Sequence, residues 1–162
     1  MVQITSIETT VREHPFFDGM DLETTTLIAG CAKHEVYHAG EFLYREGQVM
    51  EAFHLIRHGT VALEVHAPGR DPLIMETVET GDIVGWSWLV PPYRSQVDAR
   101  AVGLVRTLTF DATCLRGKCD AEPTVGYQFL KRFLPVVAAR FAAARLQMLD
   151  LYGDDKRTRG MG

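Results

Sequence analysis

Hydrophobic and polar positions change their spacing twice along the chain, which divides it into three zones. In the first zone, residues 1–30, the segment "DLETTTLIAG" places apolar residues at the spacing of an α-helix. Asp21 is a suitable N-cap for this helix, and Gly30 is a suitable stop. We therefore expect a helical lead-in.

The second zone, residues 31–110, has short apolar alternations separated by glycines. The segments "EFLYREG" and "AFHLIRHGTVALEVHA" have the alternation of β-strands, and Gly59 marks a tight turn between two of them. Around eight short strands at this spacing are typical of a barrel or jelly roll.

The third zone, residues 111–152, is helical again. Asp111 is placed to cap a short helix, and Pro123 is placed as the first residue of a long one. In the long helix, apolar residues recur in alternating steps of four and three, which is a heptad seam. The seam residues are Leu130, Leu134, Val137, Phe141, Ala144, Met148 and Leu151.

This seam would suit a homodimer in which two copies of the long helix pair, and the alternative is that its residues face the chain's own roll. The contact residues of the dimer would be Leu134, Val137, Phe141, Met148 and Leu151. Pro135 should kink the helix, because it removes one backbone hydrogen bond. We expect Gly153 to end the helix and residues 153–162 to form a flexible tail.

Composition narrows the class of protein. The 162 residues suit a single domain, here 1–152, and the net charge of −4 argues against a dominant nucleic-acid surface. There is no apolar run long enough to cross a membrane, and the N-terminus is too polar for a signal peptide. The three cysteines, Cys31, Cys114 and Cys119, show no CxxC spacing, so we expect reduced thiols in a cytoplasmic protein.

The order of the turn glycines resembles the cyclic-nucleotide-binding domain family, in the branch of the catabolite activator and Fnr-type regulators. The resemblance covers roughly residues 14–152. It rests on Gly40 before "EFLYREG", the pair Glu46-Gly47, Gly59, the pair Gly81-Asp82, and Gly85. It implies an α+β, mainly β fold: an antiparallel double-stranded β-helix, or jelly roll, flanked by N-terminal helices and a long C-terminal helix.

In that family, the amides of a short helix after a glycine hold the cyclic phosphate. An acidic residue next to the glycine holds the ribose, and an arginine about ten positions on pairs with the phosphate. Here Gly85 matches the glycine, whereas Trp86 replaces the acid, Ser95 replaces the arginine, and Arg94 lies one position earlier. Each lost charge-assisted bond costs about 1.5–3 kcal/mol, so we expect weak binding of cAMP or cGMP.

Three interpretations of this segment stay open. Arg94 could hold a phosphate after a register shift around Pro91-Pro92; Trp86 and Trp88 could line a pocket for a flatter, less charged ligand; or the tryptophans could fill the pocket. The ligand would be a cyclic nucleotide or another small phosphorylated or aromatic molecule, and no cofactor is expected. The candidate ligand-binding residues are Val84, Gly85, Trp86, Ser87, Trp88, Leu89, Arg94, Ser95 and Gln96.

Asp98 and Arg100 alternate with small apolar residues on the strand after this segment. We interpret them as a solvent-facing pair, or as residues that orient Arg94.

An enzyme is the weaker alternative. His34, His38 and Glu41 lie close in sequence and would suit a cupin-like metal site, but the spacing is HxxxH, with no second motif. GxSxG and GxGxxG are absent. No helix-turn-helix fits into "GDDKRTRGMG", so we expect no direct DNA binding. The leading hypothesis is a non-catalytic sensor that signals to a downstream protein, and the rival is a ligand-free structural or interaction module.

Overall fold

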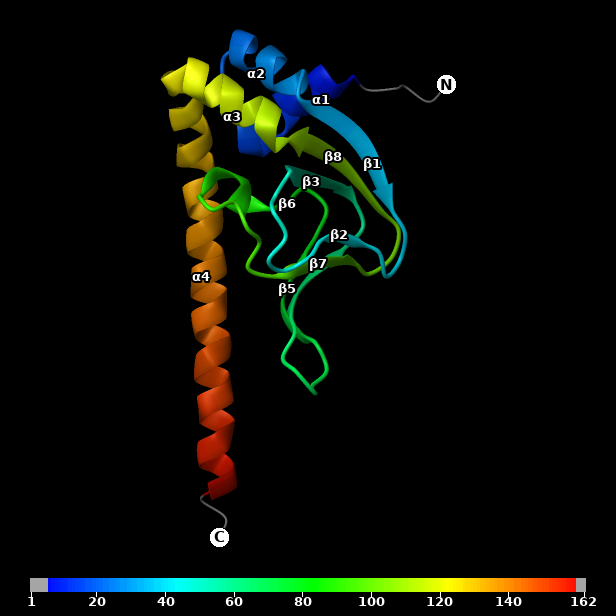
Figure 1. Cartoon of the computed structure of the whole chain (residues 1–162), viewed down its shortest axis with the longest axis vertical. Coiled ribbons are helices and arrows are strands. Elements are labelled where there is room, and N and C mark those ends of the chain that lie inside the picture. The colour runs from blue at the N-terminus through cyan, green and yellow to red at the C-terminus, as the bar shows by residue number, and fades with distance from the viewer. Residues whose placement is uncertain (1–5, 160–162) are drawn as a thin grey trace.

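The computed structural model describes residues 6–159, and Figure 1 shows a β-roll with one long helix running beside it. The helical segments are α1 (Ile7–Glu13), η1 (Pro15–Phe17), α2 (Leu22–Ala29), η2 (Trp86–Leu89), α3 (Ala112–Ala121) and α4 (Pro123–Arg159). The strands are β1 (Ala32–Tyr37), β2 (Phe42–Tyr44), β3 (Ala52–His58), β4 (Val61–Val65), β5 (Leu73–Val78), β6 (Ile83–Val84), β7 (Asp98–Ala101) and β8 (Val105–Asp111).

The strands form two antiparallel four-stranded sheets. One sheet has the order β1-β8-β3-β6, and the other has the order β2-β7-β4-β5. Strands distant in sequence, such as β1 and β8, are neighbours, as in a jelly roll. The predicted α+β, mainly β class is confirmed, with helices before the roll and a long helix after it.

The helix starts are where the sequence predicts them. The Asp21 side chain accepts a hydrogen bond of 2.7 Å from the Thr24 amide at the start of α2. The Asp111 side chain accepts one of 2.6 Å from the Cys114 amide at the start of α3. Both are N-caps that satisfy otherwise unpaired amides, and Pro123 begins α4 as expected.

Gly59 joins β3 to β4 at a position that only glycine fits. Its φ is +94°, and a Cβ atom there would lie 2.3 Å from the Leu104 carbonyl oxygen. Any side chain would therefore clash with backbone, which explains the tight turn expected between these strands.

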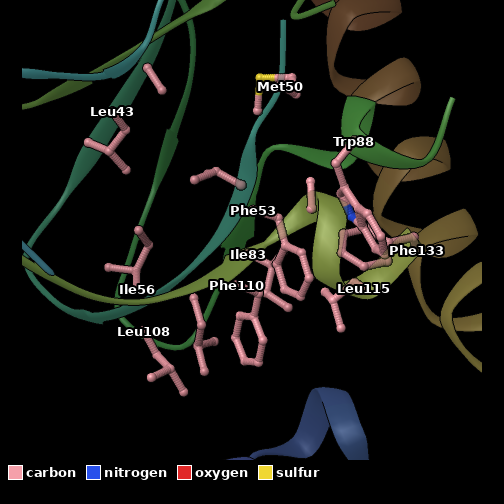
Figure 2. Close-up of a cluster of buried hydrophobic side chains, with 14 of the residues drawn as sticks. Leu43, Met50, Phe53, Ile56, Ile83, Trp88, Leu108, Phe110, Leu115 and Phe133 are labelled. Carbon is pink, nitrogen blue, oxygen red and sulfur yellow. The ribbon is translucent and has the colours of Figure 1, made fainter. Parts of the chain in front are cut away.

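An aromatic cluster joins the helices to one face of the β1-β8-β3-β6 sheet (Figure 2). The Phe53 ring stacks on Phe110 at 4.5 Å between centroids and on Trp88 at 5.3 Å. Phe133 of α4 meets Phe53 edge-on at 5.0 Å. Burying each ring contributes about 1.5–3 kcal/mol, so this cluster holds α4 against the roll.

The expected end of the long helix is wrong. Helix α4 passes through Gly153 and ends at Arg159, which leaves only residues 160–162 of the expected tail outside the described residues. A glycine inside a helix costs only about 1 kcal/mol relative to alanine. Pro135 likewise lies inside the continuous helix.

The expectation of three reduced thiols is also wrong. Cys31 and Cys114 form a disulfide with their Cα atoms 5.8 Å apart, and Cys119 is free. The two cysteines are 83 positions apart in sequence. They meet because the Asp111 amide donates to the Cys31 carbonyl, which places the start of α3 beside the start of β1.

Between residues 6 and 159, the structure has no helix whose length and hydropathy would allow it to cross a membrane.

Candidate ligand-binding site

Gly85 turns the chain from β6 into the short helix η2. Its φ is +99°, and a Cβ atom there would lie 3.0 Å from Met50 Cε and 3.3 Å from the Ala52 carbonyl oxygen. Glycine is required both by the backbone conformation and by the closeness of β3. The predicted turn into a short helix therefore has a steric origin.

A cavity of about 340 Å³ lies between η2, the roll and α4. Leu63 and Met75 line it from the roll, and Val137, Phe141 and Ala144 line it from α4. The size is within the range of small-molecule sites, and an apolar wall with few polar groups is typical of them.

Five of the nine predicted ligand-binding residues lie around this cavity. They are Gly85, Trp86, Ser87, Ser95 and Gln96. Val84 and Trp88 belong to the buried core instead, and Leu89 packs against that core. Arg94 is exposed and does not line the cavity.

The two tryptophans have different roles. Trp86 is half-buried and lines the cavity. Trp88 is fully buried in the aromatic cluster, and its indole N–H has no hydrogen-bond partner among the residues that the structure describes. Residues two apart in this tight helix point to different sides, so only Trp86 is available to a ligand.

The Arg94 side chain is hydrogen-bonded to a neighbouring turn and does not line the cavity. Its guanidinium donates a hydrogen bond of 2.7 Å to the Gly47 carbonyl. The Ser95 hydroxyl is also occupied locally, because it donates to the Val97 carbonyl at 2.7 Å and accepts from the Val97 amide at 3.3 Å. The Ser95 hydroxyl is therefore engaged locally, whereas the Arg94 guanidinium keeps its charge and further N–H donors outside the cavity.

Arg140 of α4 is a cavity residue that the sequence analysis missed. Its side chain is 18% exposed and lies 3.4 Å from the Glu76 carboxylate of β5, and it also donates to the Ile83 carbonyl. The signal was present, since Arg140 is three residues after Val137 and four before Ala144, on the same helix face. Burial raises the pKa of Tyr44 in the same cavity, and the Arg140 charge opposes that shift.

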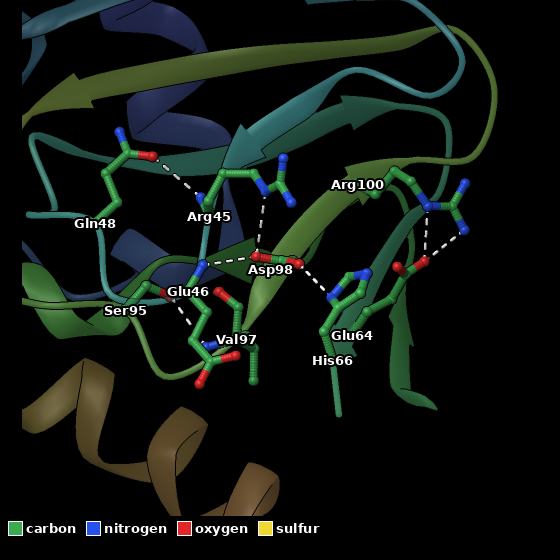
Figure 3. Close-up of polar contacts among 9 residues, drawn as sticks. All are labelled: Arg45, Glu46, Gln48, Glu64, His66, Ser95, Val97, Asp98 and Arg100. Atoms are coloured by element: carbon green, nitrogen blue, oxygen red, sulfur yellow. Dashed lines mark hydrogen bonds and ion pairs between the residues drawn. The ribbon is translucent and has the colours of Figure 1, made fainter. Parts of the chain in front are cut away.

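The interpretation of Asp98 as a solvent-facing residue is wrong. Its side chain is buried, and it accepts from the Glu46 amide at 2.6 Å and from His66 Nδ1 at 2.6 Å (Figure 3). Arg45 lies 3.6 Å away. Asp98 thus fixes the turn at residues 45–48 against β7. The Gly47 carbonyl of this turn accepts the hydrogen bond from Arg94.

Arg100 pairs with the buried Glu64 carboxylate, with Nε 2.7 Å from Oε1 (Figure 3). It does not orient Arg94.

The predicted dimer seam divides between two faces of α4. Leu134, Phe141 and Met148 are 69%, 70% and 55% exposed. Val137 and Ala144 are half-buried and line the cavity, and the Leu151 side chain lies outside the described residues. The exposed apolar residues at heptad-compatible spacing, which we call the α4 stripe, are Tyr127, Leu130, Leu134, Phe141, Met148 and Tyr152.

The histidines considered for a metal site do not come together. His34 and His38 are exposed, and Glu41 accepts a hydrogen bond from the His38 amide. Among the residues that the structure describes, no group of three or more His, Cys, Asp or Glu side chains could hold a metal ion.

Comparison with known proteins agrees with this architecture. The family model for the cyclic nucleotide-binding domain matches residues 34–122. No curated protein matches the sequence significantly.

Solved structures with the same fold include a putative cyclic nucleotide-binding protein from Geobacter metallireducens. It is 23% identical, with a TM-score of 0.71 over 79% of this chain and 92% of that one. A cyclic nucleotide-binding domain from Methylobacillus flagellatus is 18% identical, with a TM-score of 0.71 over 89% and 79%. The catabolite activator protein of Thermus thermophilus is 22% identical, with a TM-score of 0.65 over 86% and 63%.

The family model covers more than half of the chain, and its range contains every strand from β2 to β8 together with Gly85 and η2. This chain belongs to the cyclic nucleotide-binding domain family.

Proposed function

We propose that this chain is a non-catalytic sensor domain whose cavity beside Gly85 binds a small, largely apolar or aromatic ligand in place of a cyclic nucleotide. The observation that carries the proposal is the composition of the cavity wall. Trp86 and apolar residues of α4 line it, and the charges of Arg140 and Glu76 already face each other.

A cyclic phosphate would find no free cation among the described residues of this cavity. Arg94 does not line the cavity, and Arg140, which does, is paired with Glu76. Trp86 stands where the family has its ribose-binding acid. An uncharged aromatic ring would instead bury its faces against Trp86 and Phe141, which is favourable without breaking an ion pair.

The cavity also provides a route for a signal. Much of its wall is α4, and the same helix carries the exposed α4 stripe. We propose that two copies pair through this stripe. A ligand that packs against Val137 and Ala144 would favour one position of α4 over another, and so change the dimer or a downstream partner.

Ala144→Trp tests the site, because the indole would fill the cavity. The purified protein is screened by thermal shift against cAMP, cGMP and a panel of aromatic amides and carboxylic acids. A hit at 100 times its Kd should add about 2.7 kcal/mol of stability to the wild type. We expect Ala144→Trp to abolish this effect.

Ala142→Trp is the matched control, since Ala142 is exposed on the same helix and does not line the cavity. It should respond like the wild type. Tight binding of cAMP with no binding of any apolar compound would reject the proposed ligand class. Equal responses of the two variants would place the ligand elsewhere.

A further inference from the structure

A second cavity lies at the other side of Tyr44, which is the one described residue that lines both cavities. Its volume is about 490 Å³, within the range of small-molecule sites. It is bordered by β1, β3 and residues 48–52. It does not include Gly85, η2 or α4, so a ligand bound here is independent of the proposed function.

Polar side chains line this cavity where a roll interior is normally apolar. The strand register places Thr109 of β8 opposite both Lys33 of β1 and His54 of β3. Thr109 and His54 are 3% and 4% exposed. Burying such groups costs free energy unless they are hydrogen-bonded, so a polar row beside a cavity favours a ligand site.

His54 presents an unpaired nitrogen to a ligand. Among the described residues, its ring makes one side-chain hydrogen bond, between Nδ1 and the Thr109 hydroxyl at 2.9 Å. Its ring also stacks on Tyr44 at 6.2 Å between centroids. Burial lowers the pKa of His54 to about 4, so the ring is neutral near pH 7 and carries one donor and one acceptor.

The remaining polar groups offer mainly acceptors. The Tyr37 hydroxyl donates to Glu35 Oε2 at 2.6 Å, which leaves its lone pairs open. The Glu35 carboxylate can only accept. Burial raises the Glu35 pKa, but hydrogen bonds from Tyr37, Lys33 and Thr109 outweigh it and lower the pKa. The Thr109 hydroxyl lies 2.9 Å from His54 Nδ1 and 2.8 Å from the Thr107 hydroxyl, so it is engaged within the sheet.

The charged side chains around the cavity are mostly negative, which also favours a ligand that donates hydrogen bonds. Glu35, Glu51 and Asp111 line it with three carboxylates, against the single ammonium of Lys33 among the described lining residues. Lys33 Nζ lies 3.0 Å from Glu35, and its side chain is 71% exposed, so a ligand can displace it. We propose that this cavity binds a small organic cation rich in N–H donors, a primary ammonium or a guanidinium.

Titration of the chain with methylguanidinium, putrescine and agmatine tests this site. Binding is followed through the NMR shifts of the His54 ring and the Thr109 amide. Tetramethylammonium has the charge without N–H donors, and glycerol has donors without charge. We expect saturable shifts with the first three compounds only. Similar shifts with tetramethylammonium, binding of glycerol alone, or no saturation with any compound would overturn the proposal.

Two variants sharpen the test, and the NMR spectrum reports whether each is folded. Glu35→Gln should weaken binding about 10-fold or more, because it removes a charge-assisted acceptor. Lys33→Met should tighten binding, because it removes the competing ammonium. Glu23→Gln, an exposed site on α2, should match the wild type. Binding by Glu35→Gln within about twofold of the wild type would contradict the assignment.

Discussion

At the scale of single residues, buried polar side chains affect the stability of this domain. His54, Glu64 and Asp98 are no more than 4% exposed inside a small roll. Arg100 pairs with Glu64, and the Glu46 amide and His66 contact Asp98, whereas His54 has one hydroxyl partner on Nδ1. Replacing any of the three should therefore change the free energy of unfolding by a measurable amount.

His54 makes the stability of the domain depend on pH. Its pKa is about 4 in the folded chain, against 6.5 in the unfolded chain. Above pH 6.5 both states are neutral and His54 contributes no pH dependence. As the pH falls from 6.5 to 4 the unfolded state takes up the proton first, which lowers the free energy of unfolding by about 3 kcal/mol.

Urea denaturation of the wild type and His54→Gln between about pH 7.5 and pH 4 measures this effect. The difference between the two should grow steadily below pH 6.5. His34→Gln, an exposed histidine on β1, should follow the wild type. Parallel curves for the wild type and His54→Gln would show that the ring is not buried as described.

Asp98→Ala should lower the free energy of unfolding by about 2–3 kcal/mol, because it removes the acceptor for the Glu46 amide and the partner of His66. The Arg45 and His66 side chains beside it are 59% and 40% exposed, so no buried charge is stranded. Asp71→Ala, at an exposed position, should change the stability by less than about 0.5 kcal/mol. A loss of stability for Asp98→Ala as small as that for Asp71→Ala would contradict the contacts of Asp98 with the Glu46 amide and His66.

At the scale of the element, α4 has two different apolar faces. Phe129 and Phe133 hold it in the aromatic cluster, and Val137 and Ala144 close the ligand cavity. The α4 stripe runs beside this face from Tyr127 to Tyr152, and Phe141 belongs to both, since it is exposed and also lines the cavity. One helix therefore connects the core, the cavity and the proposed dimer contact.

Leu134→Glu tests that contact, because Leu134 is exposed in the α4 stripe and lines no described cavity. Loss of a buried leucine from each of two copies costs at least about 3 kcal/mol, or a roughly 100-fold weaker dimer. Sedimentation equilibrium should show a shift toward monomer, whereas Ala142→Glu should stay like the wild type. An unchanged association constant for Leu134→Glu would show that the α4 stripe is not the dimer interface.

At the scale of the whole molecule, the Cys31–Cys114 disulfide links the lead-in helices to the end of the roll. It closes a loop of 83 positions. In the chain-entropy description, a loop of that length stabilises the folded state by about 4–5 kcal/mol.

Cys114→Ser should therefore lower the urea concentration at which half of the protein is unfolded. A reductant should lower this midpoint for the wild type toward the value of the variant. Cys119→Ser is the control, since this thiol is free and half-buried. Native protein should titrate with one free thiol under oxidising conditions. Three titratable thiols in the folded, air-oxidised protein would contradict the pairing.

Local features of the fold could be predicted because their causes lie within a few residues. Asp21 and Asp111 cap the amides that follow them, and Gly59 and Gly85 adopt conformations that other residues avoid. Alternating apolar residues similarly predicted the strands, and glycine spacing predicted the family. In the candidate site, the family resemblance pointed to Gly85, Trp86 and Ser95, and these three residues line the cavity.

What the sequence alone determined is this order of caps, turns and strands, since each depends on neighbours along the chain. Only the tertiary structure decided that Trp88 lies in the core while Trp86 faces the cavity, and that Arg94 binds the Gly47 carbonyl. It also decided that Arg140 enters the cavity and that Cys31 meets Cys114. These outcomes depend on partners up to 83 positions away, which no local pattern encodes.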